Sequence, residues 1–368
     1  MKIAKIIVSE HAIPSTGNGS WTQRVEYFLT TNQNNIDCFI CGTSTKELKT
    51  TTQFFRVKQF KSRLIQKFFP DFRYSRYTNK LHQLSLEYDH LIVCVIDNVK
   101  LKIAVSDCID QLNLKNKITL LFYSCGYSYF LNNDEHKLFL KNCDEVIYLT
   151  KNAYHFNKDK YYEFISEVSV LGNPIDKTIF HKIPQQDKES LLKKHNLKGK
   201  VVFLWLAHDR EKKGLSIILN AWKDWKQNED VVLLVVGANR NQKIDGVQFI
   251  GEVDKEKVDE YYKLAHVYLF PTLCKEGFGL SLAQAMCCGC YAIAANNGGV
   301  SDFFTNQDGT LIASPNIVSS WVESMEEAYS KIHSGWESKE AGNQILNYQQ
   351  WSSQFAQIFQ KWEDRINQ

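Results

Sequence analysis

The chain has 368 residues, of which 44% are hydrophobic and 23% charged, which is the balance of a soluble globular protein with room for two domains. The net charge of only +3 excludes nucleic-acid binding driven by overall charge, so any electrostatic partner must recognise a local patch. The first apolar run, at residues 3–8, is interrupted by Lys5 and is too short for a signal-peptide core or a membrane span. We therefore expect a cytoplasmic protein.

Short β-branched runs alternate with amphipathic helical patterns along the chain, which predicts parallel α/β sheets. In the first half, the strand-like runs lie at residues 3–8, 38–41, 90–95, 118–123, 145–149 and 168–171. In the second half, they lie at residues 201–206, 231–236, 247–250, 267–270 and 291–294. Because each half begins with a buried strand, a polar turn and a helix, the pattern predicts two Rossmann-like domains.

The change from one half to the other falls near Asn173 and Pro174, followed by a polar, lysine-rich stretch. We place the first domain at residues 1–180 and the second at 181–345. Residues 346–368 form a third segment, with apolar side chains at helical spacing: Trp351, Phe355, Ile358, Phe359 and Trp362. This spacing predicts a C-terminal amphipathic helix.

The chain contains ten cysteines, and most of them lie in or beside apolar strand-like runs, where a free thiol behaves as a small hydrophobic group. Cys38 and Cys41 form a C-x-x-C pair, but they fall on an alternating strand pattern without a second pair at metal-ligand spacing. We interpret them as core residues rather than as a zinc or redox site. Unpaired thiols are typical of a reducing cytoplasm.

The most informative segment, residues 271–289, follows a predicted buried strand and opens a helix through a glycine turn. Gly277 and Gly279 let a ligand approach the main chain, and the free N–H groups at a helix N-terminus favour an anionic phosphate. Glu276 precedes the turn, and Gln284 lies one to two turns into the helix, where its amide can bind ribose hydroxyls. Taken alone, the segment is equally consistent with an ordinary strand-to-helix turn that exposes a glutamate.

A basic loop follows the first strand of the second half and contains His208, Arg210 and Lys213. Taken alone, such a loop is most simply a solvated basic turn. Its place at the first strand-to-helix connection of a Rossmann-like unit instead predicts a phosphate-binding role.

These segments resemble the family 4 glycosyltransferases, retaining enzymes of the GT-B fold, and the resemblance runs over most of the sequence. That family carries two glutamates separated by seven residues, of which Glu276 matches the first, while Gln284 replaces the second. Lys213 matches the family's diphosphate-binding lysine; His208 stands at the position of its arginine, and Arg210 follows two residues later. Further matches are Pro271, Ala285, Met286 and Gly289, the interdomain turn at residues 170–180, and the loops at 297–302 and 308–312.

The resemblance implies an α/β protein of the GT-B fold, with two Rossmann-like domains facing across a cleft and a C-terminal helix crossing back to the first domain. It implies Glu276 and Lys213 as catalytic residues. The implied donor-binding residues are Arg210, His208, Gly277, Phe278, Gly279, Leu280, Gln284 and, in the first domain, Gly17 and Gly19. Gly17 and Gly19 are explained equally well by a tight turn.

The implied activity is that of a retaining, metal-independent hexosyl- or N-acetylhexosaminyl-type transferase without a cofactor. It would move a sugar from a UDP- or GDP-linked donor to a glycan or glycolipid acceptor in cell-surface polysaccharide or lipopolysaccharide biosynthesis. The replaced acid and arginine motivate an alternative, a non-catalytic GT-B protein that binds a sugar nucleotide or a partner enzyme. A further alternative is another enzyme on this fold, such as an epimerase or a phosphorylase.

A basic aromatic tract at residues 54–80 includes an apolar stripe of Phe60, Leu64 and Phe68 flanked by Lys61, Arg63 and Lys67. A helix of this kind can lie on an anionic membrane, which would place the protein peripherally on the inner face of the plasma membrane. The equal alternative is a helix that covers the sheet with a solvated basic face. Nucleic acid is not an expected partner, because no recognition motif accompanies the patch. His11 is a candidate acceptor contact or a structural histidine.

Overall fold

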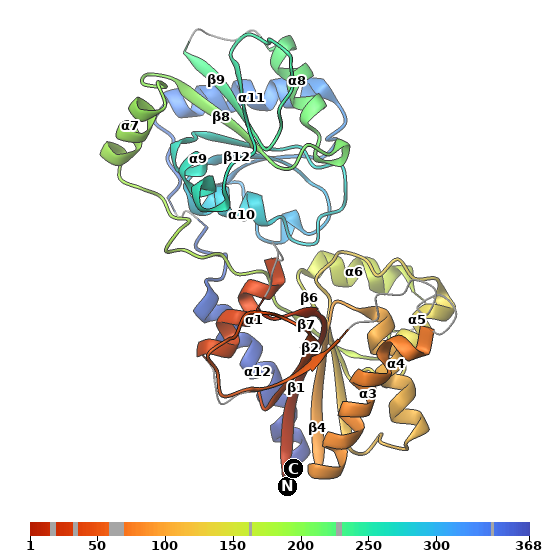
Figure 1. Cartoon of the computed structure of the whole chain (residues 1–368). Helices are drawn as coiled ribbons and strands as arrows, with labels where there is room; N and C mark the ends of the chain where they lie inside the picture. The colour runs from red at the N-terminus through yellow and green to blue at the C-terminus, as the bar shows by residue number, and fades with distance from the viewer. Residues whose placement is uncertain (15–19, 32–35, 59–69, 162–163, 226–229, 340–341) are drawn as a thin grey trace. The chain divides into compact units, whose positions relative to one another are not determined.

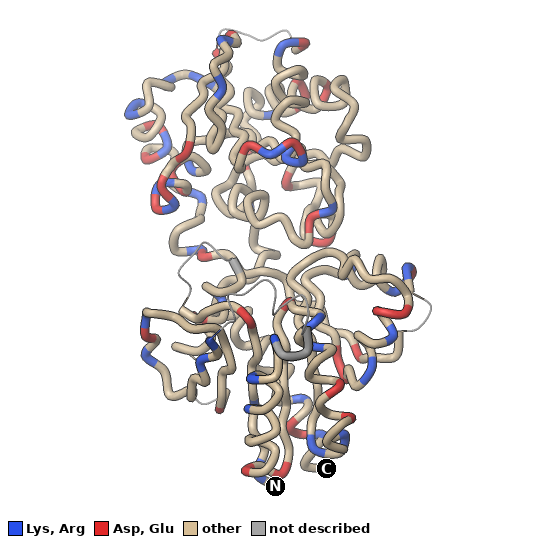
Figure 2. Tube along the Cα trace, turned by 45° about the vertical axis from the view of Figure 1, so that its right-hand side comes forward, with Lys and Arg blue, Asp and Glu red and all other residues tan. Residues whose placement is uncertain are grey.

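The computed structural model describes residues 1–14, 20–31, 36–58, 70–161, 164–225, 230–339 and 342–368. The chain forms two compact units (Figure 1): unit 1 comprises residues 1–174 and 348–368, and unit 2 comprises residues 175–347. The divisions fall after Pro174 and after Asn347, a few residues from the bounds at 180 and 345 predicted above. Figure 2 shows charged residues of both signs in the helices and loops of each unit.

Unit 1 is built on a parallel sheet of seven strands in the order β3-β2-β1-β4-β5-β6-β7. Its strands are β1 (Ile3–Ala12), β2 (Cys38–Gly42), β3 (Gln53–Val57), β4 (His90–Ile96), β5 (Ile118–Tyr123), β6 (Glu145–Tyr148) and β7 (Glu167–Val170). The central strands are buried on both faces, which is why they are continuous apolar runs without alternation.

The helices of unit 1 cover both faces of this sheet. They are α1 (Ser20–Thr31), α3 (Pro70–Glu87), α4 (Val99–Gln111), α5 (Asn133–Leu140), α6 (Lys151–Lys160) and α12 (Tyr348–Asn367). Helices α1 and α12 lie on one face of the sheet, and α3 and α4 lie on the other (Figure 1). Three helices start at side-chain caps: Asn98 accepts from Leu101 N, Asn132 from Glu135 N and Thr150 from Ala153 N.

The C-terminal helix α12 belongs to unit 1, as predicted, although it follows unit 2 in the chain. Trp351 and Phe355 are fully buried against Phe28 and Tyr123, and the Trp351 indole donates to the Tyr123 hydroxyl at 3.2 Å. One turn before its end, the helix is held by the fully buried carboxylate of Glu145, which accepts from Trp362 Nε1 at 2.5 Å and pairs with Lys361 at 2.8 Å. These aromatic and ionic contacts fix α12 on the sheet.

Unit 2 is built on a parallel sheet of six strands in the order β10-β9-β8-β11-β12-β13. Its strands are β8 (Val201–Leu206), β9 (Val231–Val236), β10 (Val247–Gly251), β11 (Val267–Phe270), β12 (Tyr291–Ala295) and β13 (Gly309–Ile312). Counted within the unit, this is the 3-2-1-4-5-6 order of a dinucleotide-binding Rossmann sheet. The strand order reverses between β8 and β11, and this switch point is where such sheets bind ligands.

The helices of unit 2 bury a core rich in aromatic residues. They are α7 (Gln185–Lys194), α8 (Leu215–Asp224), α9 (Val258–Leu264), α10 (Leu280–Cys287) and α11 (Val318–His333), with three short 3₁₀ turns, η1 (Glu211–Lys213), η2 (Lys255–Lys257) and η3 (Val300–Asp302). Trp205, Trp222 and Trp321 are almost completely buried between β8, α8 and α11. This packing leaves the carboxyl ends of the strands to the loops that carry the candidate site.

Two strands were missed by the sequence patterns, and both lie at a sheet edge. β3 covers residues 53–57, so the start of the basic aromatic tract is a strand and not a helix, whereas residues 70–80 lie in α3. β13 covers residues 309–312, which we had interpreted as a loop. The apolar stripe proposed to contact membranes, with Phe60, Lys61, Arg63, Leu64, Lys67 and Phe68, lies outside the described residues. In the described part of the chain, no helix combines the length and the apolar character needed to cross a membrane.

Seven of the ten cysteines are buried as predicted for core residues, whereas Cys108, Cys125 and Cys274 are partly exposed. Cys38 and Cys41 lie inside β2 and are no more than 3% exposed, and burial raises the pKa of Cys38 to about 11. All ten thiols are free. Among the described residues, no group of three or more His, Cys, Asp or Glu side chains is placed to hold a metal ion.

Candidate functional site

The candidate site lies at the carboxyl ends of β8 and β11, on either side of the switch point in the sheet of unit 2. Lys213 is the last residue of η1, in the connection from β8 to α8. Glu276 lies in the connection from β11 to α10. Adjacent parallel strands end at the same edge of a sheet, so the topology itself brings these two connections together.

Gly214 holds the lysine loop against the end of β11. Its φ of 70° is left-handed, and a Cβ here would lie 2.0 Å from the carbonyl oxygen of Pro271, so glycine is required. The loops are also joined by a hydrogen bond of 2.8 Å from Leu273 N to Lys212 O. On the other side, the buried Trp205 indole donates to Lys213 O at 3.2 Å. The backbone of Lys213 is therefore fixed on both sides.

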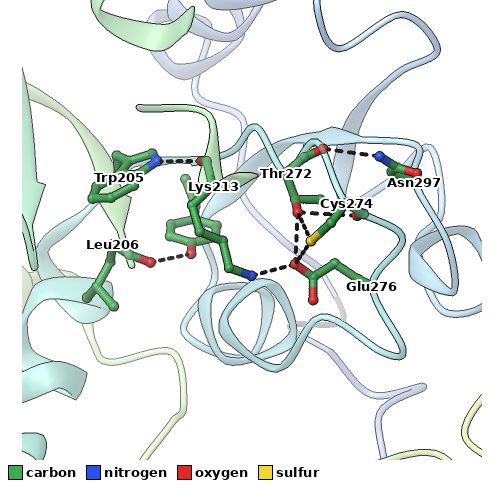
Figure 3. A network of polar contacts seen from close by, with 8 residues as sticks. Trp205, Leu206, Lys213, Thr272, Cys274, Glu276 and Asn297 are labelled. Atoms are coloured by element: carbon green, nitrogen blue, oxygen red, sulfur yellow. Dashed lines mark hydrogen bonds and ion pairs between the residues drawn. The ribbon is translucent and has the colours of Figure 1, made fainter. Parts of the chain in front are cut away.

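The side chains of Lys213 and Glu276 meet in a short ion pair (Figure 3). Lys213 Nζ lies 2.5 Å from Glu276 Oε1, and the Thr272 hydroxyl donates to the same oxygen at 2.8 Å. The two charged side chains are 26% and 17% exposed, so the pair is partly enclosed yet open to a ligand. The two residues predicted as catalytic are thus brought into direct contact.

The main chain of Glu276 is held by the loop after β12. Glu276 N donates to Asn297 O at 3.3 Å, and Gly299 N donates to Glu276 O at 2.8 Å. Gly298, with a φ of 83°, passes so close that an added Cβ would lie 2.4 Å from Glu276 O. The loop at residues 297–302 therefore holds the main chain of Glu276 in place.

After Glu276, the glycine turn leads into α10 as predicted. Gly279 is the N-cap of this helix with a φ of 97°, and no side chain of the described residues caps the first turn. The first N–H groups are consequently available to an anion. The Phe278 side chain is only 7% exposed and stacks on Phe303 at 4.6 Å between ring centroids. Phe278 thus anchors the turn, and only its main chain can contribute to binding.

Gln284 lies in α10, one turn beyond Leu280, and is partly exposed. Its side chain makes no hydrogen bond with the residues that the structure describes. The amide is thus available to a ligand.

A hollow of about 600 Å³ adjoins the lysine loop at the ends of β8, β9 and β10. It is lined by His208, Asp209, Arg210, Gly237, Ala238, Asn239, Gly251 and Glu252. The exposed side chains of His208 and Arg210 both border this space, and neither contacts the Lys213–Glu276 pair in the structure. His208 and Arg210, the two candidates for the cation that would bind the diphosphate together with Lys213, thus border the same hollow.

Arg240 is a cation of this region that sequence reasoning missed. Its guanidinium donates two hydrogen bonds, of 3.0 and 2.7 Å, to the carboxylate of Asp209. Arg240 lies in the loop after β9, and Asp209 lies in the loop after β8. These bonds lower the pKa of Asp209, so that the carboxylate stays ionised. No signal near Arg240 pointed to this contact, because the two residues are 31 positions apart.

In unit 1, the corresponding switch point lies between β1 and β4. Asp97 follows β4 with a left-handed φ of 50°, and its carboxylate accepts from Cys125 N at 2.8 Å. His11 is exposed near the end of β1 and contacts Trp21 edge-on at 5.3 Å. Gly17 and Gly19 lie outside the described residues. Their predicted role remains a prediction.

Comparisons with known proteins agree with this architecture. The sucrose-phosphate synthase of Thermosynechococcus elongatus superposes with a TM-score of 0.72 at 14% identity, covering 98% of this chain and 100% of that one. The Anabaena protein HepE, solved in complex with UDP, superposes with a TM-score of 0.70 at 14% identity and with the same coverage. With its two parallel Rossmann-like sheets, the chain has the GT-B fold, which confirms the predicted fold class.

The sequence comparisons point to glycosyltransferases. Residues 187–340 match the family model described as Glycosyl transferases group 1. A phosphatidyl-myo-inositol mannosyltransferase of Propionibacterium freudenreichii is 28% identical over 105 residues, which is 28% of this chain and 28% of that protein. The chain thus spans well under half of this relative's length in the match. The predicted resemblance is confirmed.

Proposed function

We propose that this protein is a retaining glycosyltransferase that takes its donor sugar from a nucleoside diphosphate bound at the switch point of unit 2. The observation that carries the proposal is the contact of Lys213 with Glu276 beside the uncapped start of α10. A cation and a helix N-terminus suit a diphosphate, and a carboxylate suits sugar hydroxyls. A nucleotide sugar presents these two kinds of group next to each other.

In this proposal, Lys213 and Arg210 or His208 neutralise the diphosphate and stabilise the charge that grows on it as the glycosidic bond breaks. Because these cations and the helix N-terminus act on the phosphates, we propose that the reaction needs neither a metal ion nor a cofactor. Gly277, Gly279 and Leu280 offer main-chain groups, and Gln284 binds the ribose. Glu276 binds hydroxyls of the transferred sugar and orients its anomeric carbon.

HepE was solved in complex with UDP, which supports a UDP-linked donor, and the Propionibacterium relative is named for phosphatidyl-myo-inositol, which supports a glycolipid acceptor. We propose a UDP- or GDP-linked donor and a glycan or glycolipid acceptor. We further propose a hexosyl or N-acetylhexosaminyl donor and a role in cell-surface polysaccharide or lipopolysaccharide synthesis. An enzyme with this role would act at the cytoplasmic face of a membrane.

A screen of UDP- and GDP-linked sugars by thermal shift, followed by assays of donor hydrolysis and transfer, tests the proposal. A ligand that binds only the folded protein raises its melting temperature, so at least one nucleotide sugar should do so. Purified protein should then release the nucleoside diphosphate slowly without acceptor. Failure of every nucleotide sugar to bind would contradict the proposal.

The alternative of a non-catalytic sugar-nucleotide-binding protein is motivated by the two replaced positions, His208 and Gln284. The two functions separate in one assay. A donor that binds but is neither hydrolysed nor transferred to any glycan or glycolipid would favour the binding protein, whereas measurable turnover excludes it.

Alanine substitutions identify the second cation. We expect Arg210→Ala to weaken UDP or GDP binding more than His208→Ala, because an arginine stays charged at all relevant pH values. Isothermal titration calorimetry with UDP or GDP checks this expectation, and a larger loss in His208→Ala would reverse the assignment.

The replaced acid makes an independent prediction. Gln284→Glu should retain or improve donor affinity, because a carboxylate can accept from both ribose hydroxyls. Gln284→Ala should lose about 1–2 kcal/mol of binding free energy, the scale of an unpaired hydrogen-bond partner. Titration with the nucleoside diphosphate measures both. Equal affinity of the wild type and both variants would place the ribose elsewhere.

A further inference from the structure

We propose that Thr272 is a positioning residue, which holds one oxygen of the Glu276 carboxylate so that the other oxygen faces the transferred sugar. The inference rests on the proposed function and assigns a role to a residue that the sequence motifs left without one. It starts from the asymmetry of the hydrogen bonds around Glu276 in Figure 3.

All donors that reach the carboxylate converge on Oε1. Lys213 Nζ lies at 2.5 Å, Thr272 Oγ1 at 2.8 Å and Cys274 Sγ at 3.7 Å from this one oxygen. Among the described residues, no group donates to Oε2. The carboxylate is therefore saturated on one side and open on the other.

The Thr272 hydroxyl is committed to this contact. It has one proton, and its alternative acceptors, Cys274 O and Cys274 Sγ, are both farther away at 3.4 Å and uncharged, whereas the bond to Glu276 is shorter and charge-assisted. Thr272 directly follows Pro271 beyond the end of β11 and is 1% exposed. Its carbonyl accepts from Asn297 Nδ2 at 3.4 Å, and its branched side chain has few rotamers. The donor is therefore rigid.

The contact matters most when the donor substrate is bound. Lys213 then also pairs with the diphosphate, and this second interaction weakens its ion pair with Glu276. The terminal torsion of a glutamate is broad, so a carboxylate held by one shared lysine could rotate. Thr272 remains bonded to Oε1, and Oε2 keeps both lone pairs for adjacent hydroxyls of the sugar. Thr272 thus acts through Glu276 and does not touch the substrate itself.

Thr272→Val removes the hydroxyl and keeps the shape of the side chain. We expect kcat for the nucleotide sugar selected by the screen to fall about 10- to 100-fold, as for the loss of a hydrogen bond to a charged group. The Kd of the free UDP or GDP should change less than about twofold, because the phosphates do not contact Thr272. Thr272→Ser, which restores the hydroxyl, should recover most of kcat.

Thr178→Val is the matched control, because it removes an exposed threonine hydroxyl that donates to a carboxylate outside the site, Asp176 Oδ1 at 2.5 Å, and it should leave kcat close to that of the wild type. Unchanged kcat in Thr272→Val would overturn the inference. So would a parallel loss of diphosphate affinity or a failure of serine to rescue, because either marks a merely structural role. The proposed function fails separately, if the wild type neither binds nor turns over any nucleotide sugar.

Discussion

Glu276→Gln is expected to lower kcat roughly 100-fold or more while leaving the fold intact. Lys213 and Thr272 continue to donate to the remaining carbonyl oxygen, so the amide NH₂ takes the place of Oε2. An acceptor that faces the sugar hydroxyls is replaced by a donor, and a charge near the reacting centre is lost. Removal of one electrostatic group of this kind typically costs about 10²–10³ in kcat. Donor turnover under saturating substrate measures the loss.

The same variant should bind the free nucleoside diphosphate at least as well as the wild type does. Glu276 competes with the phosphates for Lys213, and the amide competes less. Glu256→Gln, an exposed residue of η2, is a control that should leave turnover unchanged. Near-normal turnover of Glu276→Gln would remove this residue from the site.

Lys213→Ala is expected to weaken both the nucleotide sugar and the free diphosphate, by about 10- to 100-fold, the range for a lost hydrogen bond to a charged group. Both ligands carry the phosphates that the lysine neutralises, so the two losses should be similar. The effect should shrink at high salt, because screening weakens the remaining electrostatic contribution of this partly exposed cation.

Lys212→Ala is the matched control, because Lys212 is the neighbouring lysine and its side chain is exposed. Its loss should change diphosphate affinity little. If Lys213→Ala bound the diphosphate as tightly as Lys212→Ala, the loop would be only a solvated basic turn, which is the interpretation that its composition alone favours.

The central strands were predictable because each is a continuous apolar run buried on both faces of a parallel sheet. The edge strands β3 and β13 were not, although the edge strands β7 and β10 were. β3 mixes polar, charged and apolar side chains and begins the basic aromatic tract, and β13 has only four residues, of which the first two are glycine and threonine. Such short runs leave little trace in the local pattern, and pairing with one neighbouring strand orders them.

At the site, strand ends, glycine turns and helix starts are local signals that placed Lys213 and Glu276 in strand-to-helix loops, and their proposed roles came from the resemblance to the glycosyltransferase family. Thr272 and Arg240 were not singled out. Their significance comes from contacts between different loops, with Glu276 for Thr272 and with Asp209 for Arg240. Such contacts depend on where the strands end in space, which no spacing along the chain encodes.

Helix α12 completes unit 1 although unit 2 is encoded before it, and this order has a consequence for biosynthesis. A nascent chain that has produced residues 1–347 contains every strand of both sheets, yet the surface around Phe28 and Tyr123 still lacks Trp351 and Phe355. The buried carboxylate of Glu145 also lacks Lys361 and Trp362 at this stage. Every residue of unit 2 therefore precedes α12 in synthesis, whereas unit 1 cannot complete its core until residues 348–368 have been made.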